Sequence, residues 1–289
     1  MSTRSTWESS ITPHLDRIPF EDIGRGEQSS LQIKLAIEGA AGNSILLIEE
    51  PENHLSHSNM SRLIEQIDQK SAGRQTIVTT HSSFVLNKLG INNVTIVGSG
   101  RTMTLADLRQ ETWEYFRRIA GYDTLRLVLS RQVFLVEGPS DELIVQKAYQ
   151  ILYGKLPLQN GIDVIAVGSL AFLRFLEIGV LLGLNVVVIT DNDGNVAALK
   201  KKYVDYLGGQ YPNIKVYYDK DEHCKTLEPQ LLKANGREFL NNVFGKPCDQ
   251  DDDLLKYMWQ NKTDCALSLF DWRDGFSIPD YIKRAIQCE

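Results

Sequence analysis

Residues 132–142 read Gln-Val-Phe-Leu-Val-Glu-Gly-Pro-Ser-Asp-Glu, and residues 185–194 read Asn-Val-Val-Val-Ile-Thr-Asp-Asn-Asp-Gly. Each stretch begins with a short apolar run rich in β-branched or aromatic residues, which is typical of a strand buried on both faces. Each then ends in carboxylates and glycine, and glycine permits the tight turn by which a chain leaves a strand. Both stretches therefore predict strands of a mainly parallel sheet, whose chemistry lies at the carboxyl ends of the strands.

The same alternation of strand and helix patterns extends in both directions from these stretches. It indicates an α/β fold with right-handed crossovers and a Rossmann-like, mainly parallel sheet. Further strands are expected at residues 44–48, 75–79, 93–97, 163–167 and 214–218. Helices are expected at residues 31–41, 58–70, 104–130, 140–153, 170–182 and 196–207, and the region after residue 226 is expected to be mainly helical.

Composition limits the classes of protein that this chain can belong to. Its 289 residues, 43% hydrophobic and 24% charged, suffice for two globular domains. The net charge of -6 argues against a surface that holds nucleic acid by bulk positive charge, although bound metal ions would add charge that this count omits. The four cysteines show no Cys-x-x-Cys spacing, and no apolar run has the length of a signal peptide or membrane span. We expect free thiols, a cytoplasmic location and no membrane partner.

Acidic residues and a histidine follow the first two expected strands. Glu49 and Glu50 end the first strand, His81 follows the second, and a glycine-containing segment precedes the helix at residues 31–41. Acidic residues after a buried strand can hold Mg²⁺ or polarise an attacking water, and small residues at a helix start suit a phosphate. The candidate nucleotide-binding residues are Gly24, Gly26, Glu27, Gln28, Glu49, Glu50 and His81.

The order of these segments resembles the signature loop, Walker B segment and switch histidine of ABC-type ATPase heads. Glu49 stands where many such proteins have aspartate. The phosphate loop Gly-x-x-x-x-Gly-Lys-[Ser/Thr] does not occur in the chain. The resemblance thus implies the C-terminal part of a head, and we expect no independent ATP hydrolysis, with ATP a cofactor only if the phosphate-loop half is supplied.

Carboxylates dominate the two stretches that open this section. Glu137 ends one strand, Asp141 and Glu142 fall in the first turn of the following helix, and Asp191 and Asp193 flank one residue after the other strand. Adjacent strand ends would bring them together, where crowded carboxylates repel one another without a cation. Hard oxygen ligands of this kind predict a site for one or two Mg²⁺ or Mn²⁺ ions.

A single glutamate followed by Asp-x-Asp resembles the Toprim fold over roughly residues 130–270. Behind an ATPase segment, it resembles the OLD (overcoming lysogenisation defect) family, ATP-linked nucleases that include the Gabija defence nuclease. The resemblance implies Glu228 as a further metal ligand and Lys262 as the residue that stabilises charge on the phosphate. Gly168 and Ser169, after another strand, are expected to border the site with Glu142.

The resemblance also implies a domain plan and a function. The ATPase part is expected at residues 1–103, a helical linker at 104–130, and a Toprim nuclease domain with a helical C-terminal region at 131–289. The expected activity is metal-dependent DNA endonuclease cleavage or nicking, in a homo-oligomer, with an antiphage role and a helicase or other defence protein as further partner. Two alternatives stay open: a topoisomerase or primase relative, and a truncated, inactive regulatory fragment.

Overall fold

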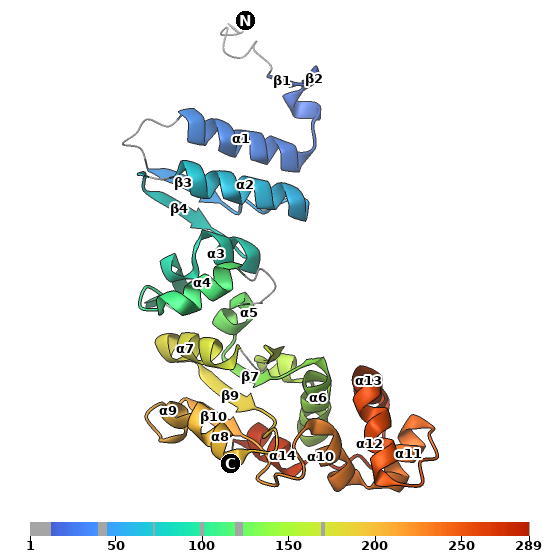
Figure 1. Cartoon of the computed structure of the whole chain (residues 1–289). Coiled ribbons are helices and arrows are strands. Elements are labelled where there is room, and N and C mark those ends of the chain that lie inside the picture. The colour runs from blue at the N-terminus through green and yellow to red at the C-terminus, as the bar shows by residue number, and fades with distance from the viewer. Residues whose placement is uncertain are drawn as a thin grey trace, which may run out of the picture. The chain divides into compact units, whose positions relative to one another are not determined.

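The computed structural model describes residues 13–39, 45–71, 73–98, 101–118, 124–168 and 171–288. The chain divides into two compact units (Figure 1). The first comprises Met1–Val94 and Trp113–Gly121, and the second comprises Thr95–Thr112 and Tyr122–Glu289. Within the described residues, no helix is both long enough and apolar enough to cross a bilayer.

A four-stranded parallel sheet forms the centre of the second unit. Its strands lie in the order β10-β9-β7-β8. The chain passes from β7 to β8 on one side and then returns to β9 on the other side of β7, so β7 and β9 meet at a topological switch point. In open parallel sheets, ligands bind outside the carboxyl ends of the strands at such a point. The strand bounds are β7 (Gln132–Val136), β8 (Ile162–Ala166), β9 (Asn185–Ile189) and β10 (Ile214–Tyr217).

Both faces of this sheet are buried. Alternate residues such as Phe134, Val164 and Val187 join a core with α6 (Pro139–Tyr153) and α14 (Asp280–Gln287). Their neighbours in sequence point to the opposite face, because side chains alternate along a strand. There α7 (Phe172–Leu182) packs closely on β9: a Cβ added to Gly179 would lie 2.8 Å from Val186 Cγ2. The continuous apolar runs of the sequence follow from this double burial.

The remaining elements of the second unit precede, connect or follow the strands of the sheet, and α12 and α13 lie on the far side of α6 from the sheet in Figure 1. A hairpin and α5 precede β7, and helices α10 to α13 follow β10 and share a core with α6. The bounds are β5 (Thr95–Gly98), β6 (Arg101–Thr104), α5 (Thr124–Leu129), η4 (Pro157–Asn160), α8 (Val196–Lys202), α9 (Val204–Leu207), α10 (Leu227–Asn235), α11 (Arg237–Phe244), α12 (Asp251–Gln260) and α13 (Lys262–Asp271).

The first unit packs helices on a short parallel strand pair, β3 and β4. Leu46 and Ile48 of β3 are buried in a core with α1 and α2, whereas Leu47 and its cross-strand partner Ile77 are exposed on the other face of the pair. The bounds are β1 (His14–Leu15), β2 (Ile18–Pro19), η2 (Phe20–Asp22), α1 (Arg25–Gly39), β3 (Leu46–Glu49), α2 (His57–Lys70), β4 (Thr76–Thr79), α3 (Ser83–Leu89) and η3 (Ile91–Asn93), with α4 (Gln110–Arg118) crossing the boundary between the units.

The expected strands are present within about two residues at each end, and the chain is a mixed α/β protein. Three helix predictions were wrong. Residues 104–130 are not helical throughout, because Thr104 ends β6 and residues 105–109 are not helical; residues 119–123, between α4 and α5, lie outside the described residues. The first helix begins at Arg25 rather than near residue 31. The helix expected at 196–207 is divided at Tyr203, whose buried ring packs edge-on against Phe172.

Candidate active site

Glu137 and Asp191 are joined across the two central strands. Glu137 Oε1 accepts hydrogen bonds from Thr190 Oγ1 at 2.7 Å and from the Asp191 backbone N–H at 3.0 Å. The register explains the contact, because β7 and β9 are parallel neighbours whose carboxyl ends lie side by side. The glutamate is therefore held by the backbone that carries the first aspartate of Asp-x-Asp.

Asp141 lies in the first turn of α6, where the chain turns after Glu137. Its Oδ2 accepts a hydrogen bond from the Gly138 backbone N–H at 3.1 Å. Burial of the carboxyl, together with the nearby charge of Glu137, raises the pKa of Asp141 to about 7, against the opposing effect of that hydrogen bond. The helix start thus places a carboxyl with a raised pKa beside the glutamate.

Asp191 has the most perturbed carboxyl of the group. Burial is the largest cause, and the charges of Asp141, Glu137, Glu228 and Asp193 add to it, so the pKa of Asp191 rises to about 9. Its Oδ1 is buried, and no group of the described residues makes a hydrogen bond to it. A buried oxygen without a donor is costly unless a ligand satisfies it.

Asp193 is exposed and lies in a sharp turn. Its φ is 50° and that of Gly194 is 73°, so two successive residues adopt the left-handed conformation. The Asp193 backbone N–H donates to Lys225 O at 3.1 Å, which fixes the turn against the loop after β10. Glycine carries the second left-handed position at no steric cost, as the sequence predicted.

Glu228 and Lys262 approach the group from two helices that follow the sheet. Glu228, only 4% exposed, lies in the first turn of α10, and its Oε2 accepts a hydrogen bond from Thr226 Oγ1 at 2.8 Å. Lys262, the first residue of α13, places its Nζ 3.2 Å from Glu228 Oε1. The lysine thus brings positive charge to a cluster that is otherwise acidic.

The chemistry of these residues fits a divalent cation. Mg²⁺ and Mn²⁺ prefer oxygen ligands, and a cation would offset the burial and the carboxylate repulsion that raise the pKa values of Asp141 and Asp191. In the part of the chain that the structure describes, no three acidic, histidine or cysteine side chains are already arranged around one point as metal ligands. The residues that would hold the ion are Glu137, Asp141, Asp191, Asp193 and Glu228.

The three residues expected to border the site have different surroundings. Glu142 lies 3.9 Å from Arg126 and accepts a hydrogen bond from Gln146, so its side chain is engaged with those groups. Gly168 adjoins the site through its backbone, whose N–H donates to Glu137 O at 3.0 Å. Ser169 lies outside the described residues.

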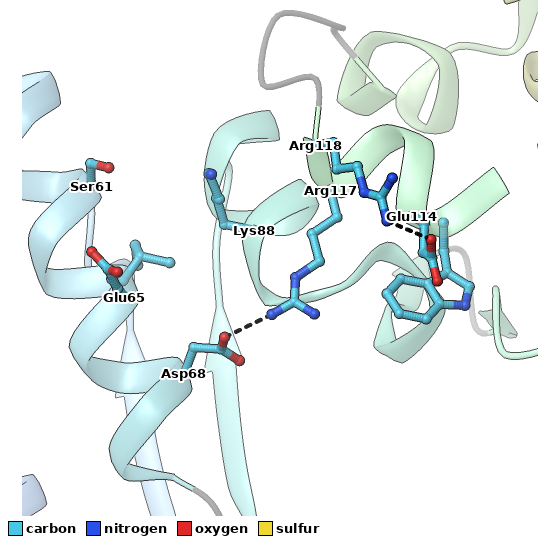
Figure 2. A pocket seen from close by; sticks show the side chains of 9 residues that line it. Ser61, Glu65, Asp68, Lys88, Glu114, Arg117 and Arg118 are labelled. Atoms are coloured by element: carbon cyan, nitrogen blue, oxygen red, sulfur yellow. Dashed lines mark hydrogen bonds and ion pairs between the residues drawn. The ribbon is translucent and has the colours of Figure 1, made fainter. Parts of the chain in front are cut away.

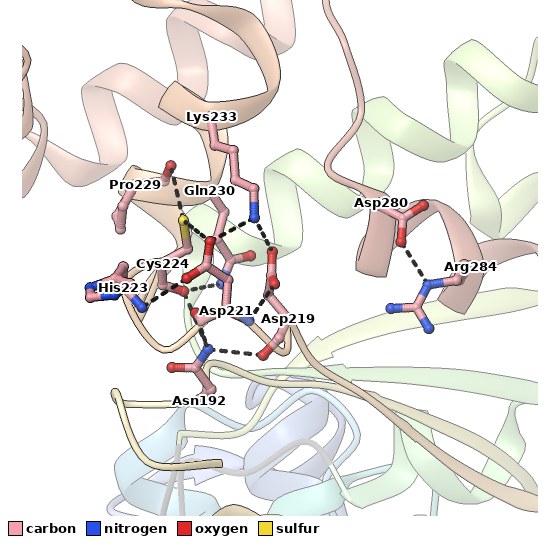
Figure 3. Close-up of polar contacts among 10 residues, drawn as sticks. All are labelled: Asn192, Asp219, Asp221, His223, Cys224, Pro229, Gln230, Lys233, Asp280 and Arg284. Carbon is pink, nitrogen blue, oxygen red and sulfur yellow. Dashed lines mark hydrogen bonds and ion pairs between the residues drawn. The ribbon is translucent and has the colours of Figure 1, made fainter.

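A second acidic pair was missed by the sequence analysis. Asp219 and Asp221 follow β10, and Lys233 of α10 pairs with Asp221 at 2.9 Å and with Asp219 at 3.8 Å (Figure 3). The hydrogen bond from Lys233 lowers the pKa of Asp221. The repeated Asp-x-Asp spacing after a strand was the available signal.

Tyr281 of α14 was also missed: it is buried, and burial together with Asp191 and Asp141 raises its pKa well above the ordinary value.

In the first unit, several of the candidate nucleotide-binding residues lie near one another. His81 Nε2 is 3.4 Å from Glu50 Oε1, and Glu52 Oε1 accepts hydrogen bonds from Thr80 Oγ1 and from the His81 N–H. Gly26 is required where α1 meets the loop after Glu52, because an added Cβ would lie 2.2 Å from His54 O.

The remaining candidate nucleotide-binding residues make no side-chain hydrogen bond or ion pair with Glu50 or His81 in the part of the chain that the structure describes. Glu49 is exposed at the end of β3. The backbone N–H groups of Glu27 and Gln28, expected to face a phosphate, both donate to Gly24 O. The start of α1 therefore offers fewer unpaired amides than the sequence suggested.

One pocket of the first unit lies away from these residues (Figure 2). It measures about 530 Å³ and is bounded by α2, α3 and α4. Two ion pairs lie at this pocket: Arg117 contacts Asp68 at 2.9 Å and Arg118 contacts Glu114 at 2.9 Å. None of the candidate site residues lines it.

Comparison with known families decides what the acidic site belongs to. Residues 128–193 match the sequence profile described as the Toprim domain of overcoming lysogenization defect protein-like proteins. This segment is similar to an OLD-like Toprim domain. Within the Toprim match lie Glu137, Asp141, Asp191 and Asp193, whereas Glu228 and Lys262 follow it in sequence. Residues 11–87 match an AAA-domain family named for the AbiEii toxin of type IV TA systems.

The chain is also similar to one curated endonuclease and to solved C-terminal regions of OLD proteins. Endonuclease GajA of Bacillus cereus (strain VD045) is 25% identical over 167 residues, which are 57% of this chain and 29% of that protein. The C-terminal region of the Xanthomonas campestris pv. campestris OLD protein aligns at 23% identity over 56% of this chain and 93% of that structure, with a TM-score of 0.41. The corresponding region of the Burkholderia pseudomallei OLD protein aligns at 19% identity over 55% and 96%, with a TM-score of 0.42.

Proposed function

We propose that this chain is a metal-dependent DNA endonuclease of OLD type, which nicks or cleaves DNA by hydrolysing phosphodiester bonds. The observation that carries the proposal is the buried, unpartnered Oδ1 of Asp191 amid carboxylates of the Toprim segment. Such a cluster is unfavourable alone and is stabilised by a cation. The similarity to Endonuclease GajA supports the same reaction class.

Two roles in this reaction fall to residues of the chain: metal binding and stabilisation of negative charge on the phosphate. Asp141, Asp191 and Glu137 would bind one or two Mg²⁺ or Mn²⁺ ions, together with Asp193 and Glu228. A bound ion supplies the positive charge that lets an acidic site accept a DNA phosphate and polarise it for attack by water. Lys262, near Glu228 and half-exposed, would offset the charge that develops on the phosphate oxygens.

The tyrosines of the site favour hydrolysis over a topoisomerase reaction. A topoisomerase needs a tyrosine hydroxyl that can reach DNA for a covalent link. Tyr203 and Tyr281, the tyrosines electrostatically coupled to the acidic cluster, are buried. Burial also raises the pKa of each hydroxyl, which makes a tyrosinate nucleophile less accessible.

The AAA segment supports further proposals that rest on family resemblance. ATP would bind only where the phosphate-loop half is supplied, and the chain would act as a homo-oligomer, in antiphage defence, with a helicase or other defence protein as partner. If nuclease activity required the complete ATPase, the isolated chain would be an inactive, regulatory fragment. The proposed domain limits at residues 103 and 130 and a cytoplasmic location remain predictions of the sequence.

Nicking of supercoiled plasmid tests the proposal. The purified chain is incubated with Mg²⁺, Mn²⁺ or EDTA beside Asp191→Ala, with Asp252→Ala of the exposed start of α12 as a matched control. We expect metal-dependent nicks that Asp191→Ala abolishes and Asp252→Ala retains. Equal cleavage by Asp191→Ala at saturating metal would refute the assignment, and relaxation without nicks would favour a topoisomerase.

A further inference from the structure

Asn192, the residue between the two aspartates of Asp-x-Asp, is buried with 2% of its surface exposed. Its side-chain Nδ2 donates to Asp219 O and to Asp221 O, both at 2.9 Å (Figure 3). Its Oδ1 accepts a hydrogen bond from the Gly194 backbone N–H at 2.8 Å. The side chain therefore donates two hydrogen bonds and accepts one, a combination that suits the NH₂ and C=O groups of an amide.

Residues 219–225 form the loop to which Asn192 donates, and contacts within the loop and with α10 hold it in place. Lys233 bridges Asp219 and Asp221, and the Asp221 N–H donates to Asp219 Oδ1 at 2.9 Å. The buried Gln230 donates from Nε2 to Cys224 O at 3.0 Å. Lys233 and Gln230 both lie on α10, the helix that carries Glu228, so the loop is tied to that helix.

Two more hydrogen bonds join this loop to the Asp-x-Asp turn. The Asp193 N–H donates to Lys225 O at 3.1 Å, and the Val196 N–H donates to Glu222 Oε1 at 2.9 Å. Through the loop after β10, the network thus links two segments that carry proposed metal ligands: the turn with Asp191 and Asp193, and α10 with Glu228. Asn192 is its buried centre.

We propose that Asn192 is a positioning residue that locks the Asp191–Asp193 turn onto the loop 219–225 and so holds the carboxylates of the site in place. The assignment rests on the proposed nuclease function. Asn192 acts through its neighbours, since its hydrogen bonds go to the backbone of the protein. Alanine at this position removes the lock, and aspartate would place a carboxylate against the carbonyl oxygens of Asp219 and Asp221.

The test compares Asn192→Ala and Asn192→Asp with Asn213→Ala in the full chain. Asn213 is the matched control, because its Nδ2 donates to Leu184 O at 2.6 Å. This bond joins the two loops that precede β9 and β10, at the end of the sheet away from the acidic site. Three quantities are measured at a temperature where all variants are folded: amide hydrogen exchange of residues 219–225, Mn²⁺ affinity by calorimetry, and plasmid nicking resolved into kcat and KM.

We expect faster exchange of the loop in both Asn192 variants and a fall in Mn²⁺ affinity or kcat of about 10–100-fold, as for groups that orient metal ligands, with KM nearly unchanged. Asn213→Ala should lower the melting temperature yet keep normal loop exchange and nicking. Unchanged exchange, or wild-type kcat and Mn²⁺ affinity in Asn192→Ala, would overturn the positioning role. A wild-type chain that neither binds Mn²⁺ nor nicks DNA would refute the nuclease, while loop exchange would still decide whether the lock exists.

Discussion

At Asp191, burial and four neighbouring carboxylates act in the same direction and raise the pKa to about 9. In an unfolded chain this carboxyl titrates near its ordinary value of 3.8. The folded state therefore binds a proton more tightly than the unfolded state. The stability that this proton contributes is fully present below about pH 4, and it is lost as the pH rises toward 9. Asp141, with a pKa of about 7, acts in the same sense.

Metal-free protein should consequently lose stability between pH 5 and pH 9, and Asp191→Asn should lose less. A difference of only ~1 kcal/mol would move the melting temperature of a unit of this size by about 2–4 °C. Thermal melts in EDTA measure the effect, with Asp252→Asn as the control that keeps the wild-type profile. Added Mg²⁺ should stabilise the wild type most at high pH and Asp191→Asn little. Identical pH profiles for the wild type and Asp191→Asn would contradict the assignment.

Lys262 permits a second prediction at the scale of one residue. Its Nζ lies 3.2 Å from Glu228 Oε1 while the lysine remains half-exposed, so it can approach a substrate phosphate. Lys262→Ala should lower kcat for nicking by about 10²–10³-fold, the usual loss when one transition-state donor is removed. Lys256→Ala is the control, because Lys256 is an exposed lysine paired with Asp253 one helix earlier. Equal losses in the two variants would point to general DNA affinity rather than catalysis.

At the scale of elements, the contact between α7 and β9 shows why the sheet is covered so closely. Gly179 faces Val186, and an added Cβ would lie 2.8 Å from Val186 Cγ2. Val186 is fully buried and its β-branched side chain has little rotamer freedom. Helix α7 can approach the strand only because this position lacks a side chain.

Gly179→Ala should therefore destabilise the second unit by about 1–3 kcal/mol, the usual cost of overpacking, even though alanine favours helix more than glycine does. Chemical denaturation measures the change. Gly208→Ala serves as the control, since its Cβ would meet Val204 O at an ordinary 3.8 Å. If the clash is the cause, Val186→Ala combined with Gly179→Ala should cost less than the sum of the two single changes.

At the scale of the whole molecule, a segment that matches an AAA-domain family precedes one that matches an OLD-like Toprim domain. The AAA segment brings Glu50 and His81 together but carries no phosphate-loop motif. We predict that the purified chain releases no phosphate from ATP above background and that Glu50→Gln leaves this background unchanged. Phosphate-release assays with and without DNA test the prediction. ATP hydrolysis that Glu50→Gln abolishes would show that the chain completes a nucleotide site by another route.

Much of the fold could be predicted from the sequence, because its signals are local. Continuous apolar runs require strands buried on both faces, and the runs at 132–136 and 185–189 became β7 and β9. Glycine after Asp193 marked the left-handed turn. The prediction that residues 104–130 are helical failed at the start of this stretch, since the pattern did not reveal that Thr104 ends β6 or that residues 105–109 are not helical.

The sequence by itself determined which carboxylates end the strands, since strand and turn patterns are written in neighbouring residues. Only the tertiary structure decided which of them meet. Strand order places β9 beside β7 and so joins Glu137 to Asp191, whereas Glu142 turns toward Arg126. It also decided that Asp219 and Asp221 are held by Lys233 and that Asn192 is buried against them. These choices depend on crossovers and helix packing between residues distant in sequence, and no local pattern records such contacts.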